Sequence, residues 1–299
     1  MTLRIAVTGA TGFVGRRLAA RLVAEGHFVR ALVRDPRRVG IDGAESLAWD
    51  AKAWDATALL DGCDAVVHVA AHIPKNMADP GEARTCVEVN ALGTLSLLES
   101  AARAGVGRFV HFSSGNVYLP RDGAVAEDAP AFPAARAPYY LGSKLLADVY
   151  VEHARRAQRI EGAILRVSSV YGPGMGEAGL VPTFARRLRA GQMLEVADGG
   201  RFASDLVFVD DVVEGAVRVL AAKAQGIFNI GSGQLSTVLD VARTMARLAG
   251  RNDALAIAAP ADGPVNSGFA PLDIERARRE LGYAPRTLAQ GLEAYLGSF

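Results

Sequence analysis

The 299-residue chain has few cysteines and few aromatic side chains. Its two cysteines, Cys63 and Cys86, form neither a CxxC pair nor a His/Cys cluster. We therefore expect no disulfide framework, but two small buried residues in a reducing compartment. No spacing of potential ligands indicates a metal site.

An excess of charge of either sign is also missing. The 33 Lys and Arg residues nearly balance the 32 Asp and Glu residues, which argues against nucleic acid or an acidic membrane surface as a partner. The first residues, MTLRIAV, leave no room for a signal peptide, and no uninterrupted apolar run approaches about 18 residues. These absences predict a cytoplasmic protein.

What the chain does have is a regular alternation of apolar runs and helical patterns. Helical spacing follows the first run and is clear over 86–105 and 138–157. The runs expected to be strands are residues 3–8, 28–33, 64–71, 107–114 and 162–170. Strands that alternate with helices predict an α/β fold, a Rossmann-like doubly wound parallel sheet.

The pattern changes after Tyr171. Residues 172–179 are a loop rich in Gly and Pro, and residues 204–222 and 226–232 look like sheet material again. The tail from about residue 234 is mostly helical. We therefore expect a dinucleotide-binding domain and a smaller, mostly helical C-terminal lobe for substrate. The first comprises residues 1–170 with 205–232 returning to it, and the second comprises 171–204 and 233–299.

The stretch TGATGFVG places Gly9, Gly12 and Gly15 between a strand and a helix. Glycine allows a tight turn and close approach of the backbone to a pyrophosphate, and the following helix offers free N–H groups to that anion. The order strand, glycine turn, helix predicts a dinucleotide site rather than a turn without a ligand.

The end of the second strand bears on which dinucleotide binds. An acidic residue there suits the ribose 2′-hydroxyl of NAD, and an arginine suits the 2′-phosphate of NADP. Arg34 occupies the first position after the strand, while Asp35 is expected to point the other way. We therefore favour NADP over NAD. The alternative is a solvated arginine cluster formed with Arg37 and Arg38.

The stretch PYYLGSK contains Tyr140, the only tyrosine with a lysine four residues later, Lys144. On a helix the two side chains share one face, whereas Tyr139 lies about 100° around. A tyrosine has a pKa of about 10, so a tyrosine that acts as a base near pH 7 needs a lower pKa, which corresponds to roughly 4 kcal/mol. The nearby Lys144 ammonium would contribute to lowering this pKa. The pair is either an acid/base couple or an accident of an ordinary amphipathic helix.

Several motifs, taken in order, resemble the extended short-chain dehydrogenase/reductase family, also called the NAD-dependent epimerase/dehydratase family. They span essentially the whole chain and include TGATGFVG, DAVVHVAA, VEVNALGT, FVHFSSGNVY, YYLGSK, LRVSSVYGPG, LVFVDDV, FNIGSG and ARRELGYAPRTLAQGL. The resemblance implies that Tyr140 is the acid/base, that Lys144 assists it and binds the nicotinamide ribose, and that Ser114 holds the substrate oxygen. It also implies a homodimer paired through the helices that carry Asn90 and Tyr140.

The same resemblance implies a set of cofactor contacts at the ends of the strands. They are Gly9, Thr11, Gly12, Phe13, Val14, Gly15, Arg34, Asp50, Ala51, Val69, Ala70, Ala71, Asn90, Tyr140, Lys144 and Val167. His72, Asn116 and Tyr171 also follow strand ends and are weaker candidates that would face the substrate. His68 and His111 lie inside strands, so we expect neutral core histidines.

Our leading interpretation is an NAD(P)-dependent oxidoreductase that acts on a carbonyl or secondary alcohol of a small molecule without a diphosphate. Ser204 stands where many family members have a diphosphate-binding arginine, and the late loop, 260–271, contains no arginine. A nucleotide-sugar epimerase or dehydratase with tightly bound NAD is the alternative, in which nearby arginines compensate: Arg186, Arg187, Arg189 and Arg201. A non-catalytic nucleotide-sensing protein is the second alternative.

Overall fold

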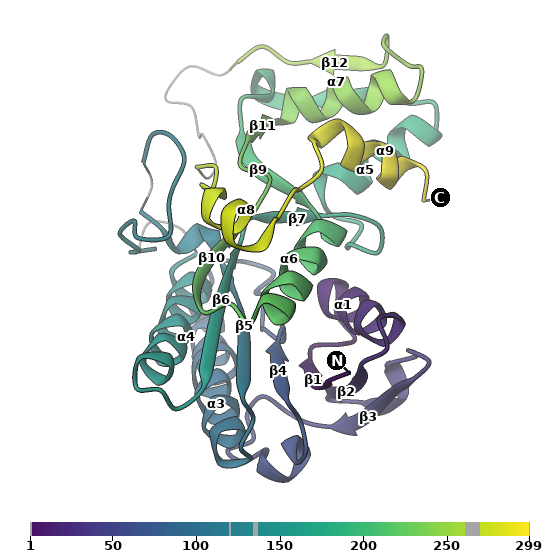
Figure 1. The fold of residues 1–299 in the computed structure, drawn as a ribbon. Helices are drawn as coiled ribbons and strands as arrows, with labels where there is room; N and C mark the ends of the chain where they lie inside the picture. Colours follow the sequence, from purple (N-terminus) through teal and green to yellow (C-terminus); the bar gives the residue numbers. More distant parts are fainter. Residues whose placement is uncertain (1, 120, 134–136, 261–269, 299) are drawn as a thin grey trace.

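The computed structural model describes residues 2–119, 121–133, 137–260 and 270–298 (Figure 1). Its main body is a seven-stranded sheet in the order β10-β6-β5-β4-β1-β2-β3, with every neighbouring pair parallel. The strands are β1 (Arg4–Thr8), β2 (Phe28–Val33), β3 (Ala44–Ala48), β4 (Ala65–His68), β5 (Arg108–Ser114), β6 (Glu161–Val167) and β10 (Gly226–Ile230).

Helices cover both faces of this sheet. The helices α1 (Phe13–Ala24) and α6 (Val209–Ala222) lie on one face, and α3 (Gly93–Arg103) and α4 (Pro138–Arg156) lie on the other (Figure 1). Successive side chains of each strand enter two separate cores, so Ile5 packs with the α1 and α6 side whereas its neighbour Ala6 packs with the α3 and α4 side. The predicted doubly wound parallel sheet is confirmed.

The long helix predicted over 86–105 has a wider turn near its start. It consists of α2 (Ala83–Cys86), a π-helical segment η4 (Val87–Leu92) and α3. A π-helical turn shifts the side chains that follow it around the axis, and such turns are frequent at functional sites. Asn90 lies inside this segment and is fully buried.

The C-terminal lobe contains two small sheets and three of the described helices. One sheet has the order β11-β9-β7, and the other pairs β12 with β8. Phe184, Met245 and Leu292 lie in its core. The elements are β7 (Ser169–Tyr171), α5 (Leu180–Arg189), β8 (Leu194–Val196), β9 (Ala203–Phe208), β11 (Leu235–Thr237), α7 (Val238–Leu248), β12 (Leu255–Ile257) and α9 (Leu288–Leu296).

The prediction of sheet structure over 204–222 is wrong in its second half. Only β9 is a strand, and it pairs with β7 and β11 rather than with the main sheet. The valine-rich stretch that follows is α6, because its buried residues recur at helical spacing: Val209, Val212, Val213, Ala216, Val219 and Leu220. The strand predicted over 162–170 is likewise divided, into β6 of the main sheet and β7 of the small one.

Strand β10 is the last strand on its side of the main sheet, and side chains cover its open edge. The carbonyl of Ile227 accepts a hydrogen bond of 2.7 Å from Arg276 Nη1 on α8 (Glu275–Leu281). The N–H of Asn229 donates to Glu127 Oε1 at 2.9 Å. The backbone groups of an edge strand otherwise invite pairing with another chain.

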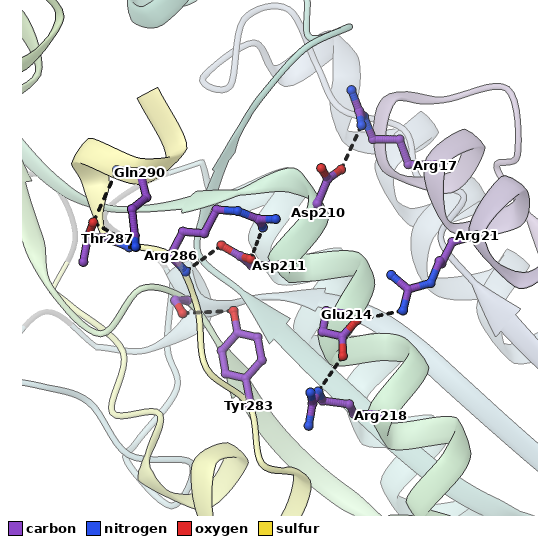
Figure 2. Close-up of polar contacts among 11 residues, drawn as sticks. Arg17, Arg21, Asp210, Asp211, Glu214, Arg218, Tyr283, Arg286, Thr287 and Gln290 are labelled. Carbon is purple, nitrogen blue, oxygen red and sulfur yellow. Dashed lines mark hydrogen bonds and ion pairs between the residues drawn. The ribbon is translucent and has the colours of Figure 1, made fainter. Parts of the chain in front are cut away.

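Ion pairs join α1, α6 and the segment before α9 around a cavity of about 700 Å³ (Figure 2). On α1, Arg17 bonds Asp210 of α6 at 2.8 Å and the Pro173 carbonyl at 2.9 Å. The segment before α9 contributes Arg286, whose side chain bonds Asp211 and whose N–H donates to the same carboxylate at 2.9 Å. These contacts hold α1, α6 and the C-terminal segment together.

In the described ranges, no helix combines the length and apolar character required to cross a bilayer.

Candidate active site

The glycine turn lies where β1 and β4 run side by side and the chain direction of the sheet's crossovers reverses. Gly9 has a φ of +70°, and a Cβ there would lie 2.8 Å from the Ala70 nitrogen. A Cβ on Gly15 would lie 2.2 Å from the Gly9 carbonyl oxygen. Both positions therefore require glycine, since a side chain would collide with backbone.

The helix that follows the turn has an open N-terminus. Gly12 is the N-cap of α1 and supplies no side-chain hydrogen bond to its first N–H groups. Thr11 is exposed, and Phe13 and Val14 are partly exposed beside it. Free N–H groups at a helix N-terminus suit a phosphate group, so this backbone fits the pyrophosphate of a dinucleotide.

Arg34 and Asp35, at the end of β2, have different surroundings. Arg34 is exposed. The Asp35 carboxylate accepts hydrogen bonds from Arg37 at 2.9 Å (Nε), 3.0 Å (Nη2) and 3.2 Å (backbone N–H), and the Arg37 side chain holds the pKa of Asp35 below its ordinary value. The Asp35 carboxylate is thus already hydrogen-bonded to Arg37. At the end of β3, Asp50 is exposed and accepts the Lys52 N–H at 2.8 Å.

The three residues expected to be catalytic lie on β5 and α4, which pack together. Ser114 ends β5, and its Oγ accepts the Asn116 N–H at 3.2 Å, which leaves its own proton available to another acceptor. Tyr140 is in the first turn of α4 and half-buried, whereas Lys144 is only 2% exposed.

Burial changes the proton affinity of both members of the pair. It raises the pKa of Tyr140 to about 12, with a further contribution from nearby Cys86. It lowers the pKa of Lys144 to about 8, against the opposing effect of Asp148. In the protein without its cofactor, the pKa of Tyr140 is thus raised rather than lowered, because burial disfavours the charged tyrosinate.

A chain of buried hydrogen bonds leads from the glycine turn toward the helix of Tyr140. Thr8 Oγ1 bonds His68 Nδ1 at 2.8 Å, and His68 Nε2 bonds Thr94 Oγ1 at 3.0 Å. Thr94 donates its own proton to the Asn90 carbonyl at 2.6 Å, so it must accept from His68. His68 consequently carries its proton on Nε2. Burial and the Lys144 charge lower the pKa of His68 to about 3, and it is neutral as predicted.

Asn90 continues this chain on the far side of Thr94. Its Oδ1 accepts the His72 N–H at 2.7 Å, and its Nδ2 donates to the His72 carbonyl and to Ser143 Oγ, both at 3.0 Å. Ser143 in turn donates to the Tyr140 carbonyl at 2.7 Å. Asn90 therefore fixes both the loop after β4 and the first turn of α4.

The weaker substrate candidates lie in three different settings. His72 is partly exposed, and its Nε2 lies 2.6 Å from Glu82 Oε2. Asn116 is partly exposed in η5 (Gly115–Val117). The prediction that Tyr171 faces the substrate is not supported by its position. Tyr171 is 2% exposed in the core of the C-terminal lobe, with its ring against Phe208. It is turned inward because β7 belongs to the small sheet.

The remaining cofactor candidates follow the carboxyl ends of the strands. Ala70 lies against Gly9, and the N–H groups of Val69 and Ala70 both donate to Thr8 Oγ1 at 3.1 Å. Val167 ends β6 and is buried. Ala51, whose carbonyl faces Gly93, and Ala71 are partly exposed.

Besides Asp211, two buried acidic residues were not among the sequence-based candidates. Asp148 on α4 accepts the Arg166 Nε–H at 3.0 Å. Asp205 on β9 accepts five hydrogen bonds, among them those from the Ser168 hydroxyl at 3.2 Å and the Leu272 N–H at 3.0 Å. The signal for Asp148 was its place one helical turn after Lys144. For Asp205 it was a carboxylate inside an otherwise apolar strand.

Two features argue against a bound diphosphate: Ser204 in place of an arginine, and the late loop, 260–271, without one. Ser204 is 8% exposed within β9. Residues 261–269 of the late loop lie outside the described residues. Within the ranges the structure describes, no three His, Cys, Asp or Glu side chains form a group that could hold a metal ion.

Comparison with known proteins identifies the family to which the chain belongs. The sequence profile described as "NAD dependent epimerase/dehydratase family" matches residues 5–231. A UDP-glucose 4-epimerase of Mycolicibacterium smegmatis is 34% identical over 97% of this chain and 96% of its own length. A dTDP-glucose 4,6-dehydratase of Streptomyces niveus is 29% identical over 97% of this chain and 90% of its own.

Among solved structures, the dTDP-glucose 4,6-dehydratase DesIV of Streptomyces venezuelae, with NAD bound, superposes with a TM-score of 0.83. It is 28% identical and aligns over 99% of this chain and 96% of its own. Because the family profile covers most of the sequence and a relative above 30% identity covers nearly all of it, the chain belongs to the NAD-dependent epimerase/dehydratase family and is an enzyme of the oxidoreductase type.

Proposed function

We propose that the protein exchanges a hydride between a nicotinamide dinucleotide and a secondary alcohol or carbonyl, with Tyr140 as the acid/base. The nicotinamide supplies or accepts the hydride when the dinucleotide is bound. Tyr140 moves a proton to or from the substrate oxygen, and Ser114 donates a hydrogen bond to that oxygen. Lys144 provides the positive charge that favours the tyrosinate. The observation that carries the proposal is the arrangement of Ser114 and Lys144 with Tyr140 at the carboxyl edge of the sheet.

The glycine turn supports a dinucleotide as the cofactor, since side chains at Gly9 and Gly15 would collide with the backbone and prevent the tight turn that leads to the open N-terminus of α1. NADP is the form that Arg34 supports, because this arginine is exposed while the neighbouring Asp35 is held by Arg37. The bound dinucleotide named for DesIV is NAD, which is the competing choice.

The substrate class rests on the relatives. The epimerase and the dehydratase are named for nucleotide sugars, and both align over the C-terminal lobe as well as the main body. We therefore propose a nucleotide sugar as the first candidate substrate. The second is a small molecule without a diphosphate, which the buried Ser204 favours, because a diphosphate without a bidentate arginine is held poorly.

Tyr140→Phe, with Tyr139→Phe as the matched control, tests the chemistry. We expect the first change to lower kcat at least about 100-fold and the second to leave it within a few-fold. Unchanged turnover in Tyr140→Phe would refute the acid/base role.

Thermal-shift titration with NAD, NADP, UDP-sugars and dTDP-sugars tests the ligands, since binding to the folded state raises Tm. Net consumption of NADPH with simple ketones would favour the second substrate class.

We also propose a homodimer that pairs the η4–α3 and α4 helices of two copies. Val87 on η4 and Leu146 and Val149 on α4 are 42%, 37% and 55% exposed, respectively, although all are apolar. Sedimentation equilibrium at micromolar concentration tests this. A monomeric mass would contradict it, and Val149→Glu should weaken a dimer without changing the fold.

A further inference from the structure

Three ionisable residues follow one another along the inner face of α4. Tyr140, Lys144 and Asp148 recur at intervals of four residues, so each lies one helical turn from the next. Lys144 is 2% exposed and Asp148 is 3% exposed. Along the helix, the lysine therefore lies one turn from a tyrosine on one side and one turn from a carboxylate on the other.

The Asp148 carboxylate has one committed and one uncommitted oxygen. Oδ2 accepts the Arg166 Nε–H at 3.0 Å. Oδ1 lies 3.7 Å from His111 Nε2, beyond hydrogen-bond distance, and has no hydrogen-bond partner among the described residues. A buried carboxylate oxygen without a donor is unfavourable unless a positive charge lies close by.

The charged and titratable groups on the neighbouring strands do not supply a negative charge to balance the Lys144 ammonium. On β5, His111 is fully buried and neutral, because burial and the Lys144 charge lower its pKa well below the ordinary value. His68 on β4 is neutral as well. On β6, Arg166 is committed to Asp148 and lies over the ring of Tyr118 at 4.7 Å.

Asp148 itself and the Cys86 thiol complete the ionisable surroundings of Tyr140 and Lys144. Burial raises the pKa of Asp148, and the positive charges of Arg166 and Lys144 oppose that effect. Near Tyr140, burial and the charge of the Glu82 carboxylate raise the pKa of the Cys86 thiol, so it stays protonated. In the part of the chain that the structure describes, Asp148 is therefore the carboxylate that acts on Lys144.

We propose that Asp148 is a positioning residue of the active site, whose carboxylate, fixed by Arg166, is the counter-charge to the buried Lys144 ammonium one helical turn away. The inference rests on the proposed roles of Tyr140 and Lys144. An uncharged Lys144 would no longer favour the tyrosinate, so Asp148 acts on the reaction through the lysine and without touching substrate.

The direct test is the titration of Lys144 itself. The chain has four lysines, so NMR of protein with 13Cε-labelled lysine gives few signals, and Lys144→Arg assigns the one of interest. We expect Asp148→Asn to move the Lys144 transition down by about one pH unit or more, and Asp148→Glu to restore it. The control is Glu152→Gln, the same change one turn further along α4, where the carboxylate bonds Arg155 and Arg156. A Lys144 transition that does not move in Asp148→Asn overturns the proposal.

The pH dependence of kcat/KM gives the second readout. Its alkaline limb should shift to lower pH in Asp148→Asn, in step with the Lys144 transition, and return in Asp148→Glu. If the lysine shifts but this limb does not, the proposed link to the reaction is wrong. Activity retained in Tyr140→Phe would instead refute the proposed function and leave the lysine titration intact.

Asp148→Asn leaves Arg166 buried without its partner, which threatens folding. The double variant Asp148→Asn, Arg166→Met removes both charges together and serves if the single variant does not fold. The Lys144 transition should again fall, by less, because the repulsion from Arg166 is lost as well. An unchanged transition in this variant also contradicts the proposal.

Discussion

The imidazole of His68 donates its Nε2–H to the hydroxyl of Thr94 over 3.0 Å, because the proton of that hydroxyl is used on the Asn90 carbonyl. We therefore predict that 15N NMR of the imidazole will show the Nε2–H tautomer. The signal should remain that of a neutral ring down to about pH 5, since the pKa of His68 is lowered to about 3. A ring that titrates between pH 6 and 7 would contradict the assignment.

Removal of the acceptor in this bond should destabilise the protein. Thr94→Val leaves a buried N–H of His68 without a partner, which costs about 1–3 kcal/mol in the free energy of unfolding. Thr183→Val, on the partly exposed face of α5, is the matched control and should change it by less than about 0.5 kcal/mol. Equal midpoints in urea for both variants would disprove this.

Lys144 is predicted to lower stability at neutral pH. Its folded pKa, about 8, lies below its ordinary value of 10.5, so the unfolded chain binds more protons between these two pH values. The destabilisation is full below pH 8 and disappears as the pH rises toward 10.5. We expect Lys144→Met to be more stable than wild type at pH 7 by up to about 3 kcal/mol, and the difference to shrink above pH 8.

Denaturant titrations across pH 6–10 measure this difference. Lys75→Met, at an exposed position, is the control and should follow the wild-type pH dependence. A Lys144→Met curve parallel to that of wild type throughout the range would show that burial does not perturb the lysine.

Arg34 is predicted to decide between the two dinucleotides. Loss of a charge-assisted hydrogen bond to a 2′-phosphate costs about 1.5–3 kcal/mol, so Arg34→Leu should weaken NADP binding roughly 10- to 100-fold and leave NAD nearly unchanged. Calorimetric titration of both ligands measures it, with Arg38→Leu, another exposed arginine, as the control. Tighter binding of NAD than of NADP by wild type would refute the NADP preference.

The ion pair between Arg286 and Asp211 is predicted to stabilise the contact between the two parts of the molecule (Figure 2). Burial raises the pKa of Asp211, and Arg286 opposes that effect. Arg286→Gln should cost about 1–3 kcal/mol, allowing for the 40% exposure of the arginine side chain. Arg278→Gln disrupts an exposed pair with Glu275 and should cost less than about 1 kcal/mol. Similar thermal midpoints for both would contradict the prediction.

The parts of the fold that sequence reasoning predicted are those with a strong local signal. Buried parallel strands are short continuous apolar runs, so β1, β2, β4, β5 and β6 were all recognised. The glycine turn was also predicted, because its geometry demands particular residues at particular positions. The strand β3 was not, since AESLA is short and only partly buried.

What sequence reasoning missed depends on contacts between distant segments. The valines of α6 have a strand-like composition, and only their helical spacing separates them from a strand. Tyr171 follows an apolar run like the other candidates, but β7 pairs with β9 and turns its ring into the lobe. Asp148 matters through Arg166, and Asp205 through Leu272, partners that spacing along the chain does not reveal.

The covered edge of β10 bears on the order in which the chain is made. A ribosome releases Ile227 well before Arg276, so a nascent chain has every strand of the main sheet while the Ile227 carbonyl at its edge is still uncovered. During that interval the strand can pair with a neighbouring chain, and α8 ends the exposure once it docks. The helix α8 therefore protects this edge against aggregation, and a chain without α8 should give less soluble protein.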